Sequence, residues 1–258
     1  MIKVSNISKN FIGIKAIDGV SFEIDQGSII GLIGPNGAGK TTLFNIVAGH
    51  LSPSSGAVYL DGEDITFLKP HELFRKGLLR TFQIAHEFSS LTVLENLMVV
   101  PGDQFGEQLV HTWFNCAKVR KADELVRKQA KEVINFLELN QMENELAGNL
   151  SGGQKKLLEL GRTMMANPKI VFLDEIGAGV SRRLLKIIAG SILRLNQQFG
   201  YTFCLIEHDM DFIARLCDMV IVMAEGRILT QGKPNEVINN EDVIEAYLGT
   251  GRKYKKVS

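Results

Sequence analysis

The stretch that decides the fold is residues 28–33, SIIGLI, which runs directly into residues 34–42, GPNGAGKTT. A short and almost wholly apolar run of this kind predicts a β-strand that is buried on both faces. The glycines that follow predict a tight loop, and the pattern LFNIVAGH after them predicts a helix. This order of strand, loop and helix is the context in which G-x-x-x-x-G-K-[ST] is typical of a phosphate-binding loop.

The residue types in this loop match the chemistry of a nucleotide phosphate. Glycines let backbone N–H groups converge on phosphate oxygens, and the helix N-terminus adds partial positive charge. Lys40 would reach the β- and γ-phosphates, the Thr41 hydroxyl would bind Mg²⁺, and Thr42 would donate to a further phosphate. The alternative is a structural glycine-rich turn before a helix. The predicted nucleotide-binding residues of the loop are Gly34, Pro35, Asn36, Gly37, Ala38, Gly39, Lys40, Thr41 and Thr42.

The wider pattern predicts an α/β fold of the P-loop NTPase (RecA-like) type. Short β-branched runs alternate with longer helical runs, which favours a mostly parallel sheet, preceded here by an N-terminal antiparallel β region. A hairpin at the sheet edge is expected near residues 226–230. The predicted strands are residues 3–4, 20–24, 28–33, 57–60, 170–173, 202–206, 220–223 and 226–230.

The middle of the chain predicts an inserted helical subdomain. No convincing strand occurs between about residues 85 and 165, and residues 119–139 show a helical period. We therefore expect one nucleotide-binding domain over residues 1–250, with its core at 1–84 and 166–235. A C-terminal helical segment at 234–250 and a flexible tail at 251–258 would follow. The expected buried face of the long helix is Ala122, Leu125, Val126, Ala130, Val133, Phe136 and Leu137.

A second buried strand ends in two acids. Residues 170–175 read IVFLDE, and we expect this strand to lie beside the strand of the phosphate loop, so that its acids reach the phosphate end of the sheet. Asp174 would hold Mg²⁺ through water, and Glu175 would act as a general base toward the attacking water. The alternative is that both carboxylates are simple solvated ends of a strand.

Residues 150–154, LSGGQ, open a helix, and with them the chain resembles the nucleotide-binding subunits of ABC transporters. This resemblance implies ATP and Mg²⁺ as ligands and a head-to-tail dimer. In it, Lys40 of one subunit and Ser151, Gly152, Gly153 and Gln154 of the other hold the same ATP. Ser151 as an ordinary helix N-cap is the structural alternative, and both roles are compatible.

Three further positions match the family pattern. The resemblance gives Gln83, in RTFQ at 80–83, a contact with Mg²⁺ and with the attacking water, and gives His208, in the IEHDM motif at 206–210, a contact with the γ-phosphate. It gives Phe11 a stacking role on adenine. The alternatives are a buried structural Gln83 and a core Phe11. The implied catalytic set is therefore Lys40, Gln83, Glu175 and His208.

One segment departs from the family pattern. After Glu175 the family usually has Pro-x-Ala-Gly-Leu and then Asp or Asn, whereas residues 176–181 here read IGAGVS. Ile176 leaves the turn less preset than proline would. Ser181 offers a shorter side chain for reaching across a dimer, so the coupling between the two ATP sites is the property that this departure affects.

The cargo is expected from subfamily features. The RTFQ form, the polar stretch at 101–121, IEHDM and the ending NNEDVIEAYLG resemble importers of branched-chain amino acids. Urea or amide import and a soluble non-transport ABC ATPase are the alternatives. The expected partners are a second ATP-binding subunit (identical or a paralogue), transmembrane permease subunits and, indirectly, a periplasmic or extracellular solute-binding protein. A groove for a permease helix is expected near Gln83.

Bulk properties exclude several other classes. Lysine plus arginine equals aspartate plus glutamate at 29 each, so charge gives no reason to expect a nucleic-acid partner. The three cysteines lack any C-x-x-C pair, and no run of 18 uncharged apolar residues occurs, which indicates a cytoplasmic chain attached to the membrane through other subunits. No Asn-Lys-x-Asp motif of GTP-binding switch proteins is present.

Overall fold

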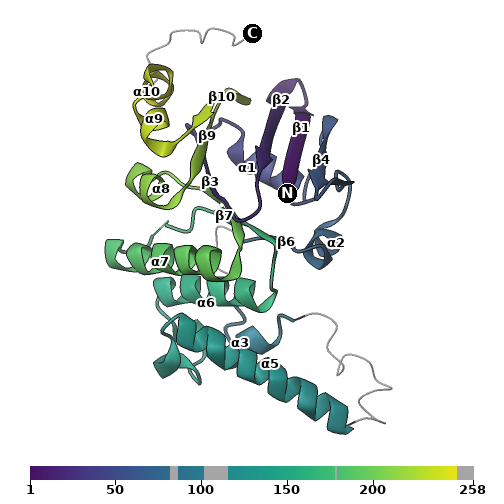
Figure 1. Ribbon diagram of the computed structural model, residues 1–258, viewed down its shortest axis with the longest axis vertical. Helices are drawn as coiled ribbons and strands as arrows, with labels where there is room; N and C mark the ends of the chain where they lie inside the picture. Colours follow the sequence, from purple (N-terminus) through teal and green to yellow (C-terminus); the bar gives the residue numbers. More distant parts are fainter. Residues whose placement is uncertain (82–86, 102–115, 178, 249–258) are drawn as a thin grey trace. The chain divides into compact units, whose positions relative to one another are not determined.

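The structure is a computed structural model that describes residues 1–81, 87–101, 116–177 and 179–248 (Figure 1). The chain divides into two compact units, which are described separately. The first unit comprises Met1–Arg80, Lys169–Ala178 and Ile192–Ser258, and the second comprises Thr81–Pro168 and Gly179–Ser191.

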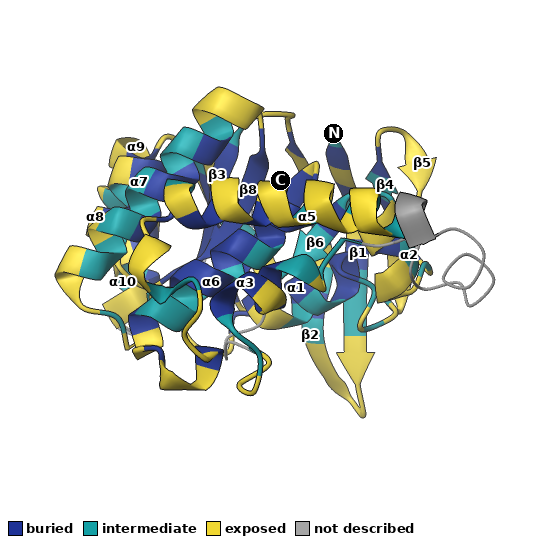
Figure 2. Cartoon of the chain, turned by 90° about the horizontal axis from the view of Figure 1, so that it is seen from below, coloured by how far each residue is buried: buried dark blue, intermediate teal, exposed yellow. Residues whose placement is uncertain are grey.

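The first unit is built on a six-stranded sheet of the expected α/β type. Five strands run parallel, and the edge strand β10 pairs antiparallel with β9, which confirms the predicted hairpin. Every residue of β3, β7 and β8 is buried, and Figure 2 shows the labelled strands β3 and β8 in the dark blue of buried residues. The strand order is β10 (Arg227–Gly232), β9 (Met219–Ala224), β3 (Ile29–Ile33), β8 (Thr202–Ile206), β7 (Ile170–Asp174) and β6 (Leu78–Arg80).

The acidic strand does not lie beside the strand of the phosphate loop, so that expectation is wrong. Strand β8 pairs in parallel with both β3 and β7 and separates them. Ile206 stands in register with Leu32 on one side and with Asp174 on the other. The three strands therefore end at the same level, and the segment that follows β8 lies between the phosphate loop and the acids.

A four-stranded antiparallel sheet forms the N-terminal β region of the first unit. Its first two strands are much longer than predicted, because polar residues alternate with buried ones and bulges interrupt the pattern. The short strands β5 and β6 were not predicted, since two or three residues carry no period. The order is β2 (Ile14–Ile24), β1 (Ile2–Phe11), β4 (Ser55–Leu60) and β5 (Glu63–Asp64).

Helix α1 (Lys40–Val47) follows the phosphate loop and supplies much of the core contact with the parallel sheet. The ring of Phe44 on α1 meets the ring of Phe172 on β7 edge to face, with centroids 5.0 Å apart. Both rings are fully buried, so this contact anchors the middle of α1 to the sheet just after the loop. The other helices of this unit are α2 (Pro70–Arg75), α8 (Met210–Leu216), α9 (Pro234–Ile238) and α10 (Glu241–Leu248).

The second unit is helical in its described residues. Helices α3 (Val93–Met98), α5 (Cys116–Phe136) and α6 (Gly152–Met165) pack on one another. At their meeting point a Cβ on Gly161 would lie 2.9 Å from a methyl carbon of Leu137, so glycine is what lets α5 and α6 approach. The short helices η2 (Asn140–Met142) and η3 (Ala147–Asn149) connect them, and α7 (Arg182–Phe199) belongs to this unit up to Ser191.

The predicted buried face of α5 is only partly correct. Ala130, Val133 and Leu137 are buried, whereas Ala122, Val126 and Phe136 are half-buried. Leu125 is 62% exposed, while Ile134, which was not on the predicted face, is buried. The fully buried positions of the helix begin only at Ala130. Leu125 sits in the preceding half of the helix, where helical period alone does not report burial.

Within the described ranges, no helix has both the length and the apolar character that a bilayer span requires.

Candidate functional site

The phosphate loop follows a path that only glycine permits at two of its positions. Gly34 has φ 147°, and a Cβ built there would lie 2.1 Å from the Met223 carbonyl oxygen at the end of β9. Gly39 has φ 98°, and its Cβ would lie 2.7 Å from the Ala16 carbonyl oxygen on β2. The loop is therefore pressed against two neighbouring strands of its own unit.

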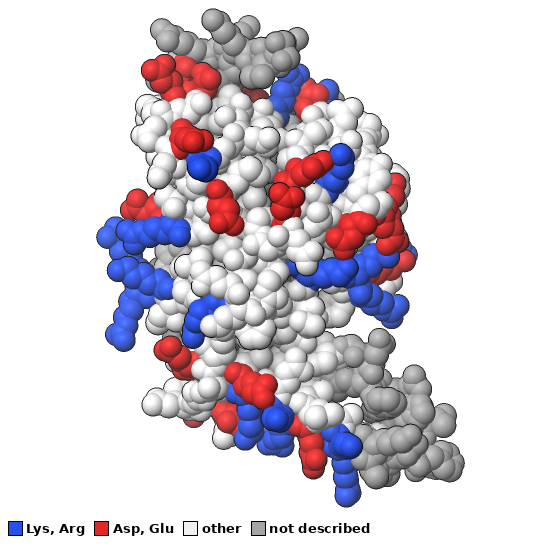
Figure 3. Space-filling model, in the orientation of Figure 1, with Lys and Arg blue, Asp and Glu red and all other residues white. Residues whose placement is uncertain are grey.

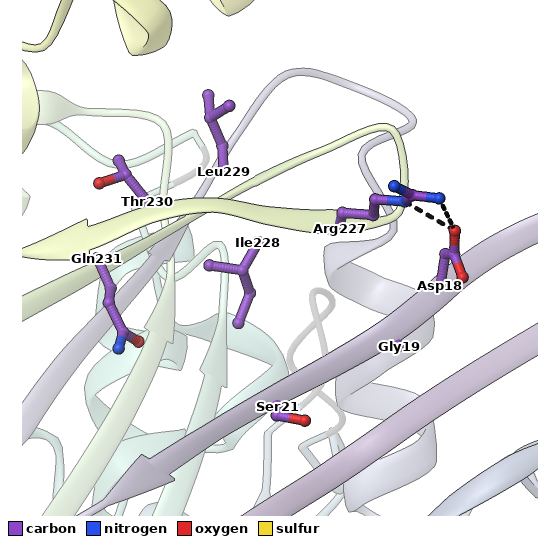
Figure 4. A pocket seen from close by; sticks show the side chains of 8 residues that line it. All are labelled: Asp18, Gly19, Ser21, Arg227, Ile228, Leu229, Thr230 and Gln231. Carbon is purple, nitrogen blue, oxygen red and sulfur yellow. Dashed lines mark hydrogen bonds and ion pairs between the residues drawn. The ribbon is translucent and has the colours of Figure 1, made fainter. Parts of the chain in front are cut away.

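Backbone hydrogen bonds connect this loop to the turn between β9 and β10. Gly226 N–H donates to the Ala38 carbonyl at 3.2 Å, and Asp18 N–H donates to the Gly226 carbonyl at 2.8 Å. Asp18 also accepts from Arg227 and pairs with Lys15, which hold the pKa of its carboxyl below the usual value, Lys15 contributing most. Figure 4 shows Asp18 and Arg227 at one end of a hollow of about 680 Å³ between β2 and β10.

Lys40 is buried and bound to its own loop. Its Nζ donates to the carbonyl oxygens of Gly34, at 2.7 Å, and Pro35, at 3.0 Å. Burial lowers the pKa of the Lys40 ammonium, while the nearby carboxylates of Glu175 and Asp174 oppose that shift. A phosphate would present better acceptors than two neutral carbonyls, so the ammonium group is placed to exchange one set of partners for another.

Asp174 lies at the end of β7 and is bound to an arginine, Arg80, for which the sequence predicts no role. Nη2 of Arg80 is 2.9 Å from Oδ2 of Asp174, and both side chains are almost fully buried. The Arg80 guanidinium also donates to Asn45 on α1 and lies 6.0 Å from the ring centroid of Phe44. The one feature of the sequence that could have pointed to Arg80 is its place as the first residue of the RTFQ motif.

Glu175 and His208 come together from adjacent strand ends. Glu175 has φ 50°, a left-handed conformation that non-glycine residues rarely adopt, and its N–H donates to the Ile206 carbonyl at 2.9 Å. Its Oε1 lies 3.1 Å from Nε2 of His208. Strained backbone of this kind is common at functional sites, since the surrounding structure has to maintain it.

Glu207 points in the opposite direction from His208, into the protein. Its Oε1 accepts a hydrogen bond from the Gly177 N–H at 2.7 Å, in the segment that departs from the family pattern. Burial raises the pKa of the Glu207 carboxyl, and the backbone N–H groups of Gly177 and His208 oppose that shift. The sequence shows Glu207 only as the second residue of IEHDM and carries no signal for its contact with the Gly177 N–H.

The residues of the first unit fit a magnesium–nucleotide ligand. Thr41 is an exposed residue with a hydroxyl group and Asp174 supplies carboxylate oxygens, which is the donor chemistry that Mg²⁺ prefers. Phe11 lies at the end of β1, 42% exposed, with Nζ of Lys9 5.2 Å from its ring centroid. Gln83 and the groove expected near it lie outside the described residues.

Residues Ser151–Gln154 of the LSGGQ motif form a closed cap at the start of α6 in the second unit. The Gln154 N–H donates to the Ser151 hydroxyl oxygen at 3.4 Å, while Oε1 of Gln154 accepts from the Ser151 N–H and hydroxyl, both at 2.9 Å. This reciprocal arrangement is a capping box. Ser151–Gln154 belong to the second unit of the chain, whereas the phosphate loop belongs to the first.

Gly153 has a packing reason to be glycine. A Cβ built on it would lie 1.5 Å from a methyl carbon of Leu184 on α7, whereas a Cβ on Gly152 would have no heavy atom within 4 Å. Helix α7 begins after Ser181, whose hydroxyl oxygen accepts from the Leu184 N–H at 3.4 Å. Ser181 thus acts as a helix cap, a local role that Asp or Asn would also fill.

Taken together, the loop, the buried lysine and the acids at a parallel strand end define a P-loop nucleotide-binding protein. Figure 3 shows acidic and basic side chains mixed on the face in view, as the equal numbers of the two kinds would suggest.

Comparisons with known proteins narrow this class. Residues 17–178 match the family described as ABC transporter, and residues 227–253 match the branched-chain amino acid ATP-binding cassette transporter family. The chain is 39% identical over 249 residues to a probable branched-chain amino acid transport ATP-binding protein of Archaeoglobus fulgidus, covering 96% of this chain and 95% of the relative.

Solved structures of ATP-binding cassettes are similar to this chain in fold. The ADP conformation of an ATP-binding cassette of an ABC transporter is 37% identical, with a TM-score of 0.82 over 96% of this chain and 98% of that one. A dimeric ATP-binding cassette bound to ADP and Pi is 26% identical, with a TM-score of 0.73 over 91% and 99%. The chain belongs to the ABC transporter family as an ATP-binding subunit.

The contact of Gly153 with Leu184 leads to a first prediction. Gly153→Ala should lower the free energy of unfolding by about 1–3 kcal/mol, because the new methyl group displaces Leu184. Gly152→Ala is the matched control and should be neutral or slightly stabilising. Urea unfolding without nucleotide measures both, and Gly153→Ala should cost no further stability in a Leu184→Ala background. Equal stabilities of the two alanine variants would contradict the packing explanation.

A second prediction concerns Glu207 and pH. The pKa of Glu207 in the folded state is raised above the ordinary 4.5, so the folded state keeps this proton to higher pH than the unfolded state does. The folded state therefore loses stability as the pH rises from the unfolded pKa to the folded pKa. A glutamine at this position stays neutral and keeps an oxygen that can accept from the Gly177 N–H. The melting temperature of Glu207→Gln minus that of the wild type should therefore increase between about pH 5 and about pH 8. Glu225→Gln, at an exposed turn, is the control. A difference that stays constant with pH would refute the buried-carboxyl account.

Proposed function

We propose that this chain hydrolyses ATP with Mg²⁺ and that the hydrolysis energises import of branched-chain amino acids. The observation that carries the hydrolytic part is the 3.1 Å contact between Oε1 of Glu175 and Nε2 of His208. Since β3, β8 and β7 end at one level, this pair stands beside the phosphate loop in the same unit.

Each residue then has a chemical task. Glu175 accepts the proton of the water that attacks the γ-phosphate. His208 orients the Glu175 carboxylate and, when the γ-phosphate is present, contacts it as well. Lys40 leaves the carbonyls of Gly34 and Pro35 to balance the charge of the β- and γ-phosphates.

The proposed metal ligands are Thr41, Asp174 and Gln83. The metal would neutralise charge between the β- and γ-phosphates. Arg80 fixes the Asp174 carboxylate from the protein side at 2.9 Å, so that its orientation does not depend on the ligand. Phe11, on the exposed end of β1, is the proposed adenine-stacking residue.

A second subunit completes the site. We place Ser151, Gly152, Gly153 and Gln154 of one subunit on the phosphates held by the other, so that ATP joins the two. The capping box supports this arrangement, because it presents a helix N-terminus with fixed side-chain oxygens and N–H groups. The solved dimeric relative bound to ADP and Pi gives a precedent for dimer formation.

The proposed cargo rests on the C-terminal family match at residues 227–253 and on the name of the Archaeoglobus fulgidus relative. In this proposal the subunit pair, homomeric or with a paralogue, docks on transmembrane permease subunits at the cytoplasmic face of the membrane. A solute-binding protein on the other side delivers the amino acid.

The hydrolytic proposal predicts the behaviour of Glu175→Gln. This variant should bind ATP, turn it over at least about 100-fold more slowly, and form a dimer with millimolar Mg-ATP, because the shared γ-phosphate persists. Light scattering after size exclusion detects the dimer. Lys40→Ala is the negative control, and Glu138→Gln controls for a glutamate at another left-handed position, φ 59°. A monomer under these conditions would be incompatible with the proposal that ATP is held between two subunits.

The cargo proposal has its own test. The chain is reconstituted in liposomes with its permease subunits and its binding protein. Leucine-loaded binding protein should stimulate ATP hydrolysis and drive leucine uptake, and Glu175→Gln should abolish both. Stimulation by urea or an amide, without stimulation by leucine, would overturn the cargo and leave the hydrolytic role intact.

A further inference from the structure

The C-terminal helix touches the phosphate loop through one hydroxyl group. The Gly34 N–H donates to Oη of Tyr247 at 2.8 Å, across 213 residues of sequence. Tyr247 stands on α10, at the opposite end of the sequence from the strand and loop that bind phosphate.

Gly34 is held from three directions within the first unit. Its N–H is bound to Tyr247, its carbonyl oxygen accepts from Nζ of Lys40 at 2.7 Å, and its Cα faces the Met223 carbonyl so closely that no Cβ would fit. Gly34 is the first residue of the loop, and its N–H is already bound to Tyr247, whereas the N–H groups that can converge on phosphate follow along the loop. Tyr247 therefore meets the loop at its root and does not compete with phosphate for the N–H groups farther along.

The rest of α10 keeps Tyr247 in place. Val243 and Ala246 are buried, and the helix packs on α9 and β10. Tyr247 itself is 38% exposed, while Ile244 and Leu248 on the same helix are more exposed. Burial raises the pKa of the Tyr247 hydroxyl, and the Gly34 N–H opposes that shift, so at neutral pH the group is an uncharged acceptor.

The hydrogen bond between Tyr247 and Gly34 gains importance when nucleotide binds. When the Lys40 ammonium turns to phosphate oxygens, its hydrogen bonds to the carbonyls of Gly34 and Pro35 weaken or break, and Gly34 then depends more on its other hydrogen-bond partner. The Tyr247 hydroxyl can remain, because it binds the other side of the residue. A loop whose root stays fixed loses less conformational entropy on binding.

We propose that Tyr247 is a positioning residue for the phosphate loop, which makes helix α10 part of the nucleotide-binding apparatus. The proposal rests on the ATP-binding role of the chain and requires neither hydrolysis nor the cargo. The rival explanation is that the hydrogen bond only anchors α10 and has no consequence for nucleotide.

Tyr247→Phe tests the proposal, because it removes the hydroxyl and keeps the ring. The full-length variant is titrated with Mg-ATP and Mg-ADP by calorimetry, and the kcat and KM for ATP are measured. We expect both nucleotides to bind about 2- to 10-fold more weakly, by a similar factor, which is the scale of one hydrogen bond. The kcat at saturating ATP should stay within about 2-fold, since Tyr247 meets none of the reacting atoms.

Two controls separate positioning from anchoring. Tyr59→Phe makes the same chemical change on β4, and Ile244→Ala removes an exposed side chain from α10 itself; both should retain wild-type affinity. Unchanged affinity in Tyr247→Phe, or an equal loss in Ile244→Ala, would overturn the proposal. A fall in melting temperature without a change in affinity would also overturn it in favour of simple anchoring. If the wild type binds ATP but does not hydrolyse it, the hydrolytic proposal fails while the affinity comparison remains decisive for Tyr247.

Discussion

The close approach of the phosphate loop to β2 and β9 is the constraint on which the site depends. At Gly34 and Gly39 there is no room for a Cβ between the loop and the carbonyl oxygens of Met223 and Ala16. The loop can therefore curl tightly enough for Nζ of Lys40 to bind carbonyls of its own backbone. The same closeness brings the loop within hydrogen-bond distance of Gly226. Any side chain at either glycine would push the loop off this support.

Strand register then decides what faces the loop. Ile206 lies level with Leu32 and with Asp174, so the residues after three parallel strands meet at one edge of the sheet. Successive residues leave a strand end in opposite directions. His208 consequently meets Glu175 near solvent, while Glu207 turns inward and binds the Gly177 N–H. One short segment after β8 thus serves both the proposed catalytic pair and the backbone that follows it.

The start of helix α6 shows how one set of residues can serve both folding and ligand binding. Ser151 and Gln154 cap α6 by binding each other, which stabilises the helix start in an isolated subunit. Gly153 sits where Leu184 leaves no space, so its identity is required by packing before any ligand is considered. A capped and tightly packed helix start is also the kind of preorganised group that a phosphate could use without further ordering.

The fold class and most residues of the candidate site could be proposed from the sequence, because the patterns that indicate them are local. Apolar runs identified β3, β7 and β8, and the glycine spacing of residues 34–42 identified the phosphate loop. Strands of two or three residues, such as β5 and β6, carry too few residues for a pattern, and the exposure of Leu125 depends on where α5 finds neighbours. The sequence also identified Glu175 and His208 separately, through motif position.

What only the tertiary structure decided are the pairings between distant residues. Strand β8 lies between β3 and β7, although the sequence suggested that those two were adjacent. Arg80 binds Asp174, Glu207 binds Gly177, and Tyr247 binds Gly34. By itself the sequence determined which residue types can hold a phosphate, because that chemistry is set by neighbours along the chain. Which distant side chains fix those residues in place depends on strand order and helix packing, and these appear only once the chain has folded.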